Sequence, residues 1–280
     1  MNFPGITFKG LILWVLLIVS CGAPQHRIIV SGHGIQTDPG IVYGVLPNGF
    51  QYILKQNSTP EDRVNIHLNI FAGSIHETDE QQGTAHFLEH LLFNGSEHFK
   101  PGELIEYFQS IGMDFGSDAN AHTTFFNTVY DLSLPKGDHK YMDDAFVVVQ
   151  DYAKGALLLE SEVVRERGII LAEKRERDSV SYRTFKKSLE FEIPDSIYNQ
   201  RFPIGIESAI KNTDRKLLKA YYDQWYRPDK MALIVVGDFD LKNVQSMIIK
   251  RFSKLQPRTS FIKKPALKTQ WKEHKGIKSF

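Results

Sequence analysis

Apolar residues along the chain follow the two spacings that distinguish strands from helices. Alternation with a period of two predicts a strand, and recurrence every three to four residues predicts a helix. Val42–Val45 and Phe50–Leu54 flank Pro47-Asn48-Gly49, and Asn-Gly between two such stretches predicts a β-hairpin. Val64–Phe71 alternates throughout, which predicts a half-buried strand. Met231–Val236 is continuously apolar and is predicted to be a buried central strand.

Helical spacing accounts for most of the remaining pattern. Pro101 and Gly112 bracket one helix, because proline fits the first helical position and glycine favours the residue after the last. The predicted helices are Thr84–Phe93, Gly102–Ile111, His139–Lys154, Leu157–Arg177, Leu217–Tyr226 and Leu241–Phe252. Two more strands are predicted at Met113–Phe115 and Thr123–Leu134, joined by a loop over residues 116–121. This order predicts an α+β domain with an antiparallel (mixed) sheet and helices packed on one face.

The first residues differ in composition from the rest. Lys9 precedes an apolar run, residues 10–19, that is shorter than the ~20 residues of a membrane-spanning helix. A positive flank, a short apolar stretch and small residues predict a secretory signal peptide over residues 1–21. The run ends in Ile18-Val19-Ser20-Cys21-Gly22, which resembles the lipobox of bacterial lipoproteins and implies that Cys21 is lipidated. The alternative is a plain signal peptide in which Cys21 has no special role.

The overall composition is that of a globular protein that buries a real core. Hydrophobic residues make up 42% and charged residues 24% of the 280 residues. Lys+Arg number 34 and Asp+Glu 33, so no charge excess draws the chain to nucleic acid. Cys21 is the only cysteine, which excludes a disulfide within the chain and a cysteine metal ligand. We expect a flexible tether over residues 22–37, the domain over 38–258, and a linker with the start of a second half over 259–280.

The most informative stretch is His86-Phe87-Leu88-Glu89-His90, in the predicted helix Thr84–Phe93. Residues four apart lie on the same face of a helix, so His86 and His90 can direct two imidazoles to one point. Two imidazole nitrogens suit a divalent ion, most often zinc. Glu89 lies beside them, where a carboxylate can act as general base on a metal-activated water.

A catalytic zinc site usually has a third protein ligand, and the predicted helix Leu157–Arg177 is rich in glutamate. Glu166 and Glu173 are two turns apart, so they share one face with Ile169 and Ile170. A carboxylate on an apolar face costs several kcal/mol unless it is paired or binds a metal. Both glutamates are therefore candidate ligands, and their positions alone do not decide between them.

Together, HFLEH and the later pair Glu166-x6-Glu173 resemble the pitrilysin family of inverted-motif zinc peptidases. The resemblance covers about residues 38–258. Other segments match in the family's order: Gly73-Ser74 with Glu77, Gly83–Gly95, Asn120-Ala121-His122-Thr123, Arg201–Gly205, Trp225–Asp229 and Val236-Gly237-Asp238. The resemblance implies a metallohydrolase domain like that of the mitochondrial processing peptidase.

The resemblance also implies roles for single residues. It makes Glu173 the third ligand of one Zn²⁺ per chain, beside His86 and His90, and makes Glu89 the general base. Glu166 would support the site from behind the ligands. Asn120 and Ala121 match a segment where family members hold a peptide substrate along a sheet edge. A role as a turn residue is the alternative for Asn120.

The predicted function is zinc-dependent hydrolysis of peptide bonds in peptides or unfolded segments. One alternative is an iron oxygenase with two histidines and a carboxylate, which leaves Glu89 unexplained. Another is a non-catalytic partner or scaffold subunit. Family peptidases enclose their substrate with a second related half, so we expect that half from another domain or chain. A lipid anchor on Cys21 would place the protein in the bacterial cell envelope, on the periplasmic side of a membrane.

Overall fold

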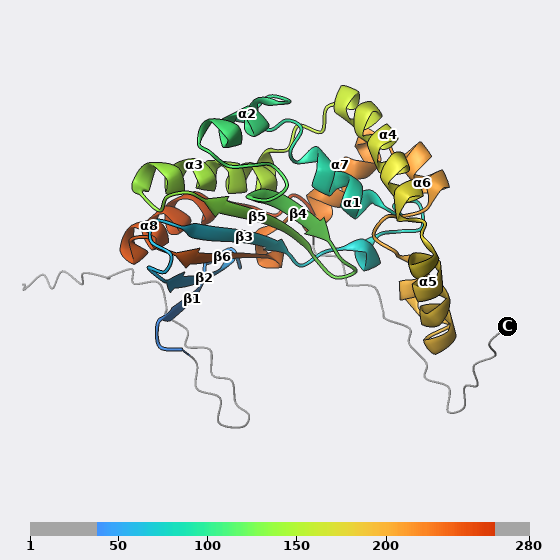
Figure 1. The fold of residues 1–280 in the computed structure, drawn as a ribbon, viewed down its shortest axis with the longest axis horizontal. Helices are drawn as coiled ribbons and strands as arrows, with labels where there is room; N and C mark the ends of the chain where they lie inside the picture. The colour runs from blue at the N-terminus through green and yellow to red at the C-terminus, as the bar shows by residue number, and fades with distance from the viewer. Residues whose placement is uncertain (1–37, 261–280) are drawn as a thin grey trace, which may run out of the picture.

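Six strands form one mixed sheet in the computed structural model, which describes residues 38–260 (Figure 1). The order across the sheet is β1-β2-β6-β3-β5-β4. The bounds are β1 Ile41–Val45, β2 Gln51–Gln56, β3 Val64–Ile70, β4 Ala119–Thr123, β5 Thr128–Leu134 and β6 Met231–Gly237. β2 and β6 are parallel, and the other neighbouring pairs are antiparallel. The predicted mixed sheet, the hairpin at Asn48-Gly49 and the buried central strand are confirmed.

Alternation along the strands gives the sheet one buried and one open face. The buried residues of β3 are Val64, Ile66, Leu68 and Ile70. Burying one such side chain contributes roughly 1.5–3 kcal/mol, so this strand alone fixes which face is covered. Its intervening residues are polar and point the other way. On that open face His67 pairs with Asp131 of β5, directly opposite in the register.

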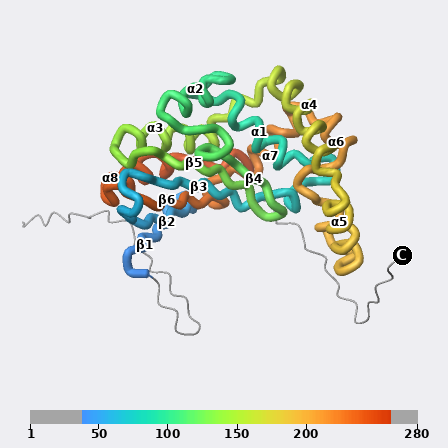
Figure 2. Tube along the Cα trace, viewed as in Figure 1, coloured from blue at the N-terminus to red at the C-terminus, as the bar shows by residue number. Residues whose placement is uncertain are grey.

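The helices cover the apolar face and extend beyond one end of the sheet (Figure 2). Their bounds are α1 Thr84–Leu91, α2 Glu103–Ser110, α3 His139–Gln150, α4 Glu160–Arg177, α5 Val180–Glu192, α6 Glu207–Asn212, α7 Arg215–Trp225 and α8 Leu241–Phe252. α3 packs against α8, and α1 packs against both α4 and α7. α4, α5 and α6 form one end of the molecule, and α4 lies there beside α1. Two segments far apart in the sequence thus meet.

Two parts of the predicted secondary structure differ from the fold. Met113–Phe115 is not a strand; only Phe115 forms an isolated bridge, to Ala119. The strand is instead β4, of which residues 119–121 were predicted as loop, and a turn at residues 124–127 divides the predicted strand Thr123–Leu134. The sequence Ala-Asn-Ala-His-Thr has no large apolar residue and so lacks the alternation that predicts a strand. Small side chains are enough here because α1 approaches the strand. α5 and α6 had no counterpart among the predicted helices, and no residue of α5 is buried.

The burial along α4 also departs from expectation. Glu166 and Ile170 are buried, at 4% and 0% exposure, but Ile169 is 46% exposed. Four residues of α4 were predicted to share an apolar face, and the exposure of Ile169 makes the buried face narrower than that prediction. Within residues 38–260, no helix combines the length and apolar character needed to span a membrane. The predicted signal peptide, Cys21 and the tether lie outside the described residues, as do most residues of the predicted linker.

Candidate metal centre

The start of α1 is fixed by a buried carboxylate and by two glycines in close contact. Glu77, 4% exposed, accepts hydrogen bonds from the backbone N–H groups of Gly83 at 2.9 Å and Ala85 at 2.8 Å. These N–H groups have no partner within the helix, so Glu77 satisfies the end of α1 by accepting their hydrogen bonds, while burial raises its pKa to about 8. Gly83 adopts φ +95° and packs against Gly205, where a Cβ would meet its Cα at 3.0 Å. The position of α1 is therefore closely constrained.

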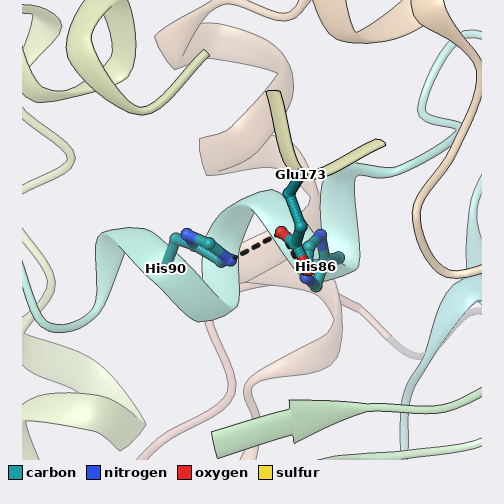
Figure 3. A group of neighbouring side chains, drawn as sticks. All are labelled: His86, His90 and Glu173. Carbon is teal, nitrogen blue, oxygen red and sulfur yellow. Dashed lines mark ion pairs between the residues drawn. The ribbon is translucent and has the colours of Figure 1, made fainter. Parts of the chain in front are cut away.

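Three side chains from two helices converge beside α1 (Figure 3). The Nε2 atoms of His86 and His90 each lie 3.5 Å from Oε2 of Glu173 on α4. The two imidazole centroids are 4.7 Å apart, one helical turn along the same face. His86 is buried, whereas His90 and Glu173 are partly exposed, so solvent reaches the cluster from one side.

The donor set and its spacing fit a zinc ion. On a tetrahedral zinc with bonds of about 2.0–2.1 Å, two ligand atoms lie about 3.3–3.4 Å apart, close to the separations of Glu173 Oε2 from the two Nε2 atoms. Oε2 of Glu173 is buried and accepts no hydrogen bond. A buried acceptor left in this way is costly, and a cation between the three atoms would satisfy it. Two imidazoles and one carboxylate leave a fourth position, as in catalytic zinc sites.

Behind His90, a second group of side chains fixes the orientation of its ring. Glu166 Oε2 lies 3.2 Å from Nδ1 of His90, and its other oxygen accepts a hydrogen bond from Asn94 at 3.1 Å. Asn94 in turn accepts from Arg165 at 2.7 Å. A carboxylate at Nδ1 keeps the proton on that nitrogen and leaves Nε2 free to bind a metal.

Arg177 constrains the other side of the site. It lies one turn beyond Glu173 on α4, and its guanidinium is 2.5 Å from Glu173 Oε1. That contact occupies one carboxylate oxygen and leaves Oε2 turned toward the histidines. The carboxylate is therefore arranged to offer a single oxygen.

Glu89 lies next to the cluster without joining it. Its carboxylate is 8% exposed, and Oε2 accepts a hydrogen bond from the hydroxyl of Thr123 on β4 at 2.5 Å. Burial raises the pKa of Glu89 to about 6, although the Thr123 hydrogen bond opposes that shift. A carboxylate with such a pKa is ionised at neutral pH yet is a stronger base than an exposed glutamate.

The charges of the three converging residues are strongly coupled. Burial, with a contribution from His90, lowers the pKa of His86 to about 3. Burial acts to lower the pKa of His90 too, but Glu166 and Glu173 outweigh it and raise that pKa to about 9. Burial acts to raise the pKa of Glu173, but His90, His86 and Arg177 outweigh it and lower that pKa to about 2. Without a metal, one imidazolium therefore balances the Glu173 carboxylate.

The structure brings five of the predicted site residues together: His86, Glu89, His90, Glu166 and Glu173. Asn120 and Ala121 lie on β4, so Asn120 is a strand residue and not a turn residue. Asn94, Thr123 and Arg177 were not predicted as site residues. Asn94 and Arg177 each lie four positions after a predicted ligand, a spacing that could have indicated them. Nothing in the sequence pattern indicates that Thr123 reaches Glu89.

Comparisons with known proteins give consistent matches. A family model described as insulinase (peptidase family M16) matches residues 52–200, and one described as the peptidase M16 inactive domain matches residues 212–279. The probable zinc protease PqqL of Haemophilus influenzae is 38% identical over 244 residues, 87% of this chain. The probable zinc protease PqqL of Escherichia coli is 32% identical over 250 residues, 89% of this chain. The chain spans 26% of the length of each of these curated relatives.

Solved structures agree with these matches. The first half of the periplasmic protease PqqL from Escherichia coli superposes with a TM-score of 0.80 at 32% identity, covering 86% of this chain and 51% of that one. The ferredoxin protease FusC, in complex with Arabidopsis ferredoxin, superposes with a TM-score of 0.74 at 32% identity, covering 82% of this chain and 25% of that one. The predicted α+β fold is thus shared with solved proteases.

Proposed function

The chain belongs to the insulinase family of peptidases, family M16, and we propose that it carries the zinc centre of an endopeptidase. Its substrates would be peptides or unfolded segments of proteins. The observation that carries this proposal is the convergence of two histidine Nε2 atoms on one oxygen of Glu173, beside the buried carboxylate of Glu89. Each Nε2 atom lies 3.5 Å from that oxygen. Relatives named as zinc proteases support zinc as the metal.

In this proposal His86, His90 and Glu173 hold one zinc ion per chain. Glu166 orients His90 and Arg177 orients Glu173, so each of these ligands presents one defined atom. When bound, zinc polarises a substrate carbonyl and lowers the pKa of a bound water. A two-histidine, one-carboxylate iron site would have the same ligand count, and metal analysis of protein purified without added metal distinguishes the two.

Glu89 is the proposed proton carrier. Its pKa of about 6 leaves it ionised at neutral pH, so it can accept a proton from the attacking water. It can then return that proton to the amine that leaves when the peptide bond breaks. Both transfers require a carboxylate close to the metal ligands but not bound to the metal, and Glu89 is one residue from His90.

The proposed substrate-binding element is β4, the last strand of the sheet formed by the described residues. Beyond the isolated bridge of Phe115 to Ala119, a peptide could pair with the outer side of β4 as a further strand, replacing the Asn120 side-chain oxygen to which the Ala121 N–H donates at 2.8 Å. The chain spans only part of its relatives, so we further propose that a second related domain or chain closes over this strand. Domain boundaries at residues 38–258, with a linker to that second half, remain part of the proposal.

The proposed location is the periplasm of a bacterium, because a structural relative is described as a periplasmic protease. Lipidation of Cys21 would add a membrane anchor. Mass spectrometry of the mature N-terminus tests this part independently of the peptidase activity.

Replacing Glu89 with Gln tests the proposed chemistry. General acid–base catalysis contributes roughly 10²–10⁴-fold, so Glu89→Gln should lower kcat by about that factor while zinc content stays unchanged. Glu173→Gln should lose both zinc and activity, because a ligand is removed. The exposed Glu106 on α2 is a matched control, since Glu106→Gln removes a charge far from the ligands. Near-native activity of Glu89→Gln would contradict the assignment of the base.

Peptidase activity should be measured on short unstructured peptides, with and without a candidate second half. Stimulation by the second half would support the two-part arrangement. A chain that binds zinc but cleaves nothing in either setting would favour a non-catalytic scaffold role instead.

A further inference from the structure

A hydrogen bond links the proposed substrate strand directly to the proposed base. Thr123 is the last residue of β4, and its hydroxyl donates to Oε2 of Glu89 at 2.5 Å. Glu89 is buried, and both groups belong to the described part of the chain. A hydrogen bond to a charged acceptor is stronger than one between neutral groups, so this contact restrains the carboxylate considerably.

The alternation along β4 explains why this residue reaches the base. Ala119, Ala121 and Thr123 share one side of the strand, and the exposed Asn120 and His122 share the other. α1 contacts β4, and the hydrogen bond from Thr123 to Glu89 places the helix on the side of Ala119 and Ala121. Two methyl groups leave room for the helix to approach, and the third position of the row supplies a hydroxyl at the level of Glu89. A larger residue at either alanine would push α1 away from the strand.

The two carboxylate oxygens of Glu89 therefore differ in their hydrogen bonding. Oε2 accepts from Thr123, whereas no described hydrogen bond engages Oε1. A base held in this way presents one defined lone pair, which favours proton transfer at a fixed position. The same contact lies two residues from Ala121, at the strand along which a peptide would pair.

We propose that Thr123 is the positioning residue of the base, and that it couples the seating of a peptide on β4 to the orientation of Glu89. This inference rests on the proposed function. A peptide paired to β4 lies about 4.8 Å from the strand. The hydroxyl of Thr123 links that strand to Glu89, so a movement of the strand also moves the base. Thr123 acts through Glu89 and does not itself touch the reacting atoms.

Kinetics of Thr123→Val and Thr123→Ser test the positioning role. Valine keeps the shape and removes the hydroxyl, so kcat should fall roughly 10- to 100-fold, as expected for loss of a hydrogen bond to a charged group. KM and zinc content should change less than about twofold. Thr123→Ser restores the hydroxyl and should recover most of kcat. A valine variant with native kcat, or a serine variant as impaired as valine, would overturn the proposal.

Thr128→Val is the matched control. Thr128 lies directly opposite Thr123 in the register, is fully buried, and donates to Ala72 O at 3.1 Å. Thr128→Val removes a threonine hydroxyl at the opposite position on the neighbouring strand β5 and changes no hydrogen bond of Glu89. Thr128→Val should lower the unfolding midpoint and leave kcat unchanged. A fall in kcat equal to that of Thr123→Val would show that both variants act through the sheet, which contradicts a specific role.

A second measurement needs neither activity nor metal. Thr123→Val should reduce the folding equilibrium constant of the metal-free chain by about tenfold or more, because a hydrogen bond to a charged acceptor is lost. In a Glu89→Ala background the same change should cost at most about twofold, since the acceptor is gone. Equal costs in the two backgrounds would show that the two side chains are not coupled.

The outcomes also separate this inference from the proposed function. If Glu89→Gln remains active, the proposed base is wrong. If Glu89→Gln is inactive while Thr123→Val is fully active and uncoupled from Glu89, the peptidase proposal stands and only the positioning role fails.

Discussion

Replacing Glu166 with Gln should weaken zinc binding and change its dependence on pH. Glu166 is 4% exposed and lies 3.2 Å from Nδ1 of His90. Glutamine keeps the size of the side chain and removes the charge. It also places an amide near Asn94, which donates to Glu166 Oε1 at 3.1 Å. The variant thus perturbs the support of one ligand without removing any ligand.

The expected size of the effect follows from the position of Glu166. Removing a side chain that supports a metal ligand typically costs 10- to 100-fold in affinity. The number of protons released when zinc binds is a second, independent quantity. His86 and Glu173 have pKa values of about 3 and 2, so neither carries a proton at pH 8. His90 has a pKa of about 9 and does, so zinc binding at pH 8 should release about one proton.

The direction in which zinc affinity changes with pH follows from this proton release. His90 must lose a proton to bind zinc, so apparent affinity should rise about tenfold per pH unit below pH 9 and level off above it. Glu166 is one of the groups that raise the pKa of His90. In Glu166→Gln that pKa falls, so fewer protons should be released at pH 8 and the levelling should occur at lower pH.

Calorimetric titration of the metal-free chain with zinc, in buffers of different ionisation enthalpy, measures both quantities together. Glu176→Gln is the control, because Glu176 is an exposed residue of the same helix. It should match the wild type in affinity and proton release. Unchanged affinity and unchanged proton release in Glu166→Gln would refute the reasoning that Glu166 holds the charge and orientation of His90.

Three further predictions, one of them with a control substitution on α4, concern the start of α1 and the base. Glu77→Ala leaves two buried N–H groups unpaired, which should lower the free energy of unfolding by about 2–6 kcal/mol in denaturant titration; a loss below ~1 kcal/mol would contradict the capping role. Gly205→Ala places a Cβ 2.5 Å from the Cα of Gly83, so thermal stability and zinc affinity should both fall. Gly168→Ala, with nothing within 4 Å, should instead stabilise the chain by about 0.5–1 kcal/mol. Finally, kcat/KM should fall below about pH 6, because protonated Glu89 cannot accept a proton; a pH–rate profile flat to pH 4.5 would argue against this base.

Most of the sheet could be predicted because its signals are local. The Asn48-Gly49 turn and the alternation of β3 specify pairing and face over a few residues. β4 could not be predicted in this way, because the side that faces α1 carries only Ala119, Ala121 and Thr123, none of which is a large apolar residue. α5 carries Tyr182, Phe185 and Leu189 at helical spacing but has no buried residue, so its pattern predicts a helix less clearly than that of a core helix.

The candidate site shows the same division between local and distant information. His86, Glu89 and His90 lie within one helix, and the spacing alone brings the two imidazoles to the same face. The choice between Glu166 and Glu173 was not available from spacing, since both lie on one face of α4. They are two turns apart, about 10.5 Å along the axis, so they reach His90 from opposite sides of its ring. Only the packing of α4 on α1 decides which one meets Nε2.

The place of β4 at the end of the sheet has a consequence for selectivity. Main-chain N–H and C=O groups are the same in every residue, so a strand edge recognises any segment that can be drawn out straight. Such a surface selects for freedom of conformation more than for identity. A substrate that pairs with β4 as proposed would therefore need a segment that can be drawn out straight, which a stably folded protein does not offer.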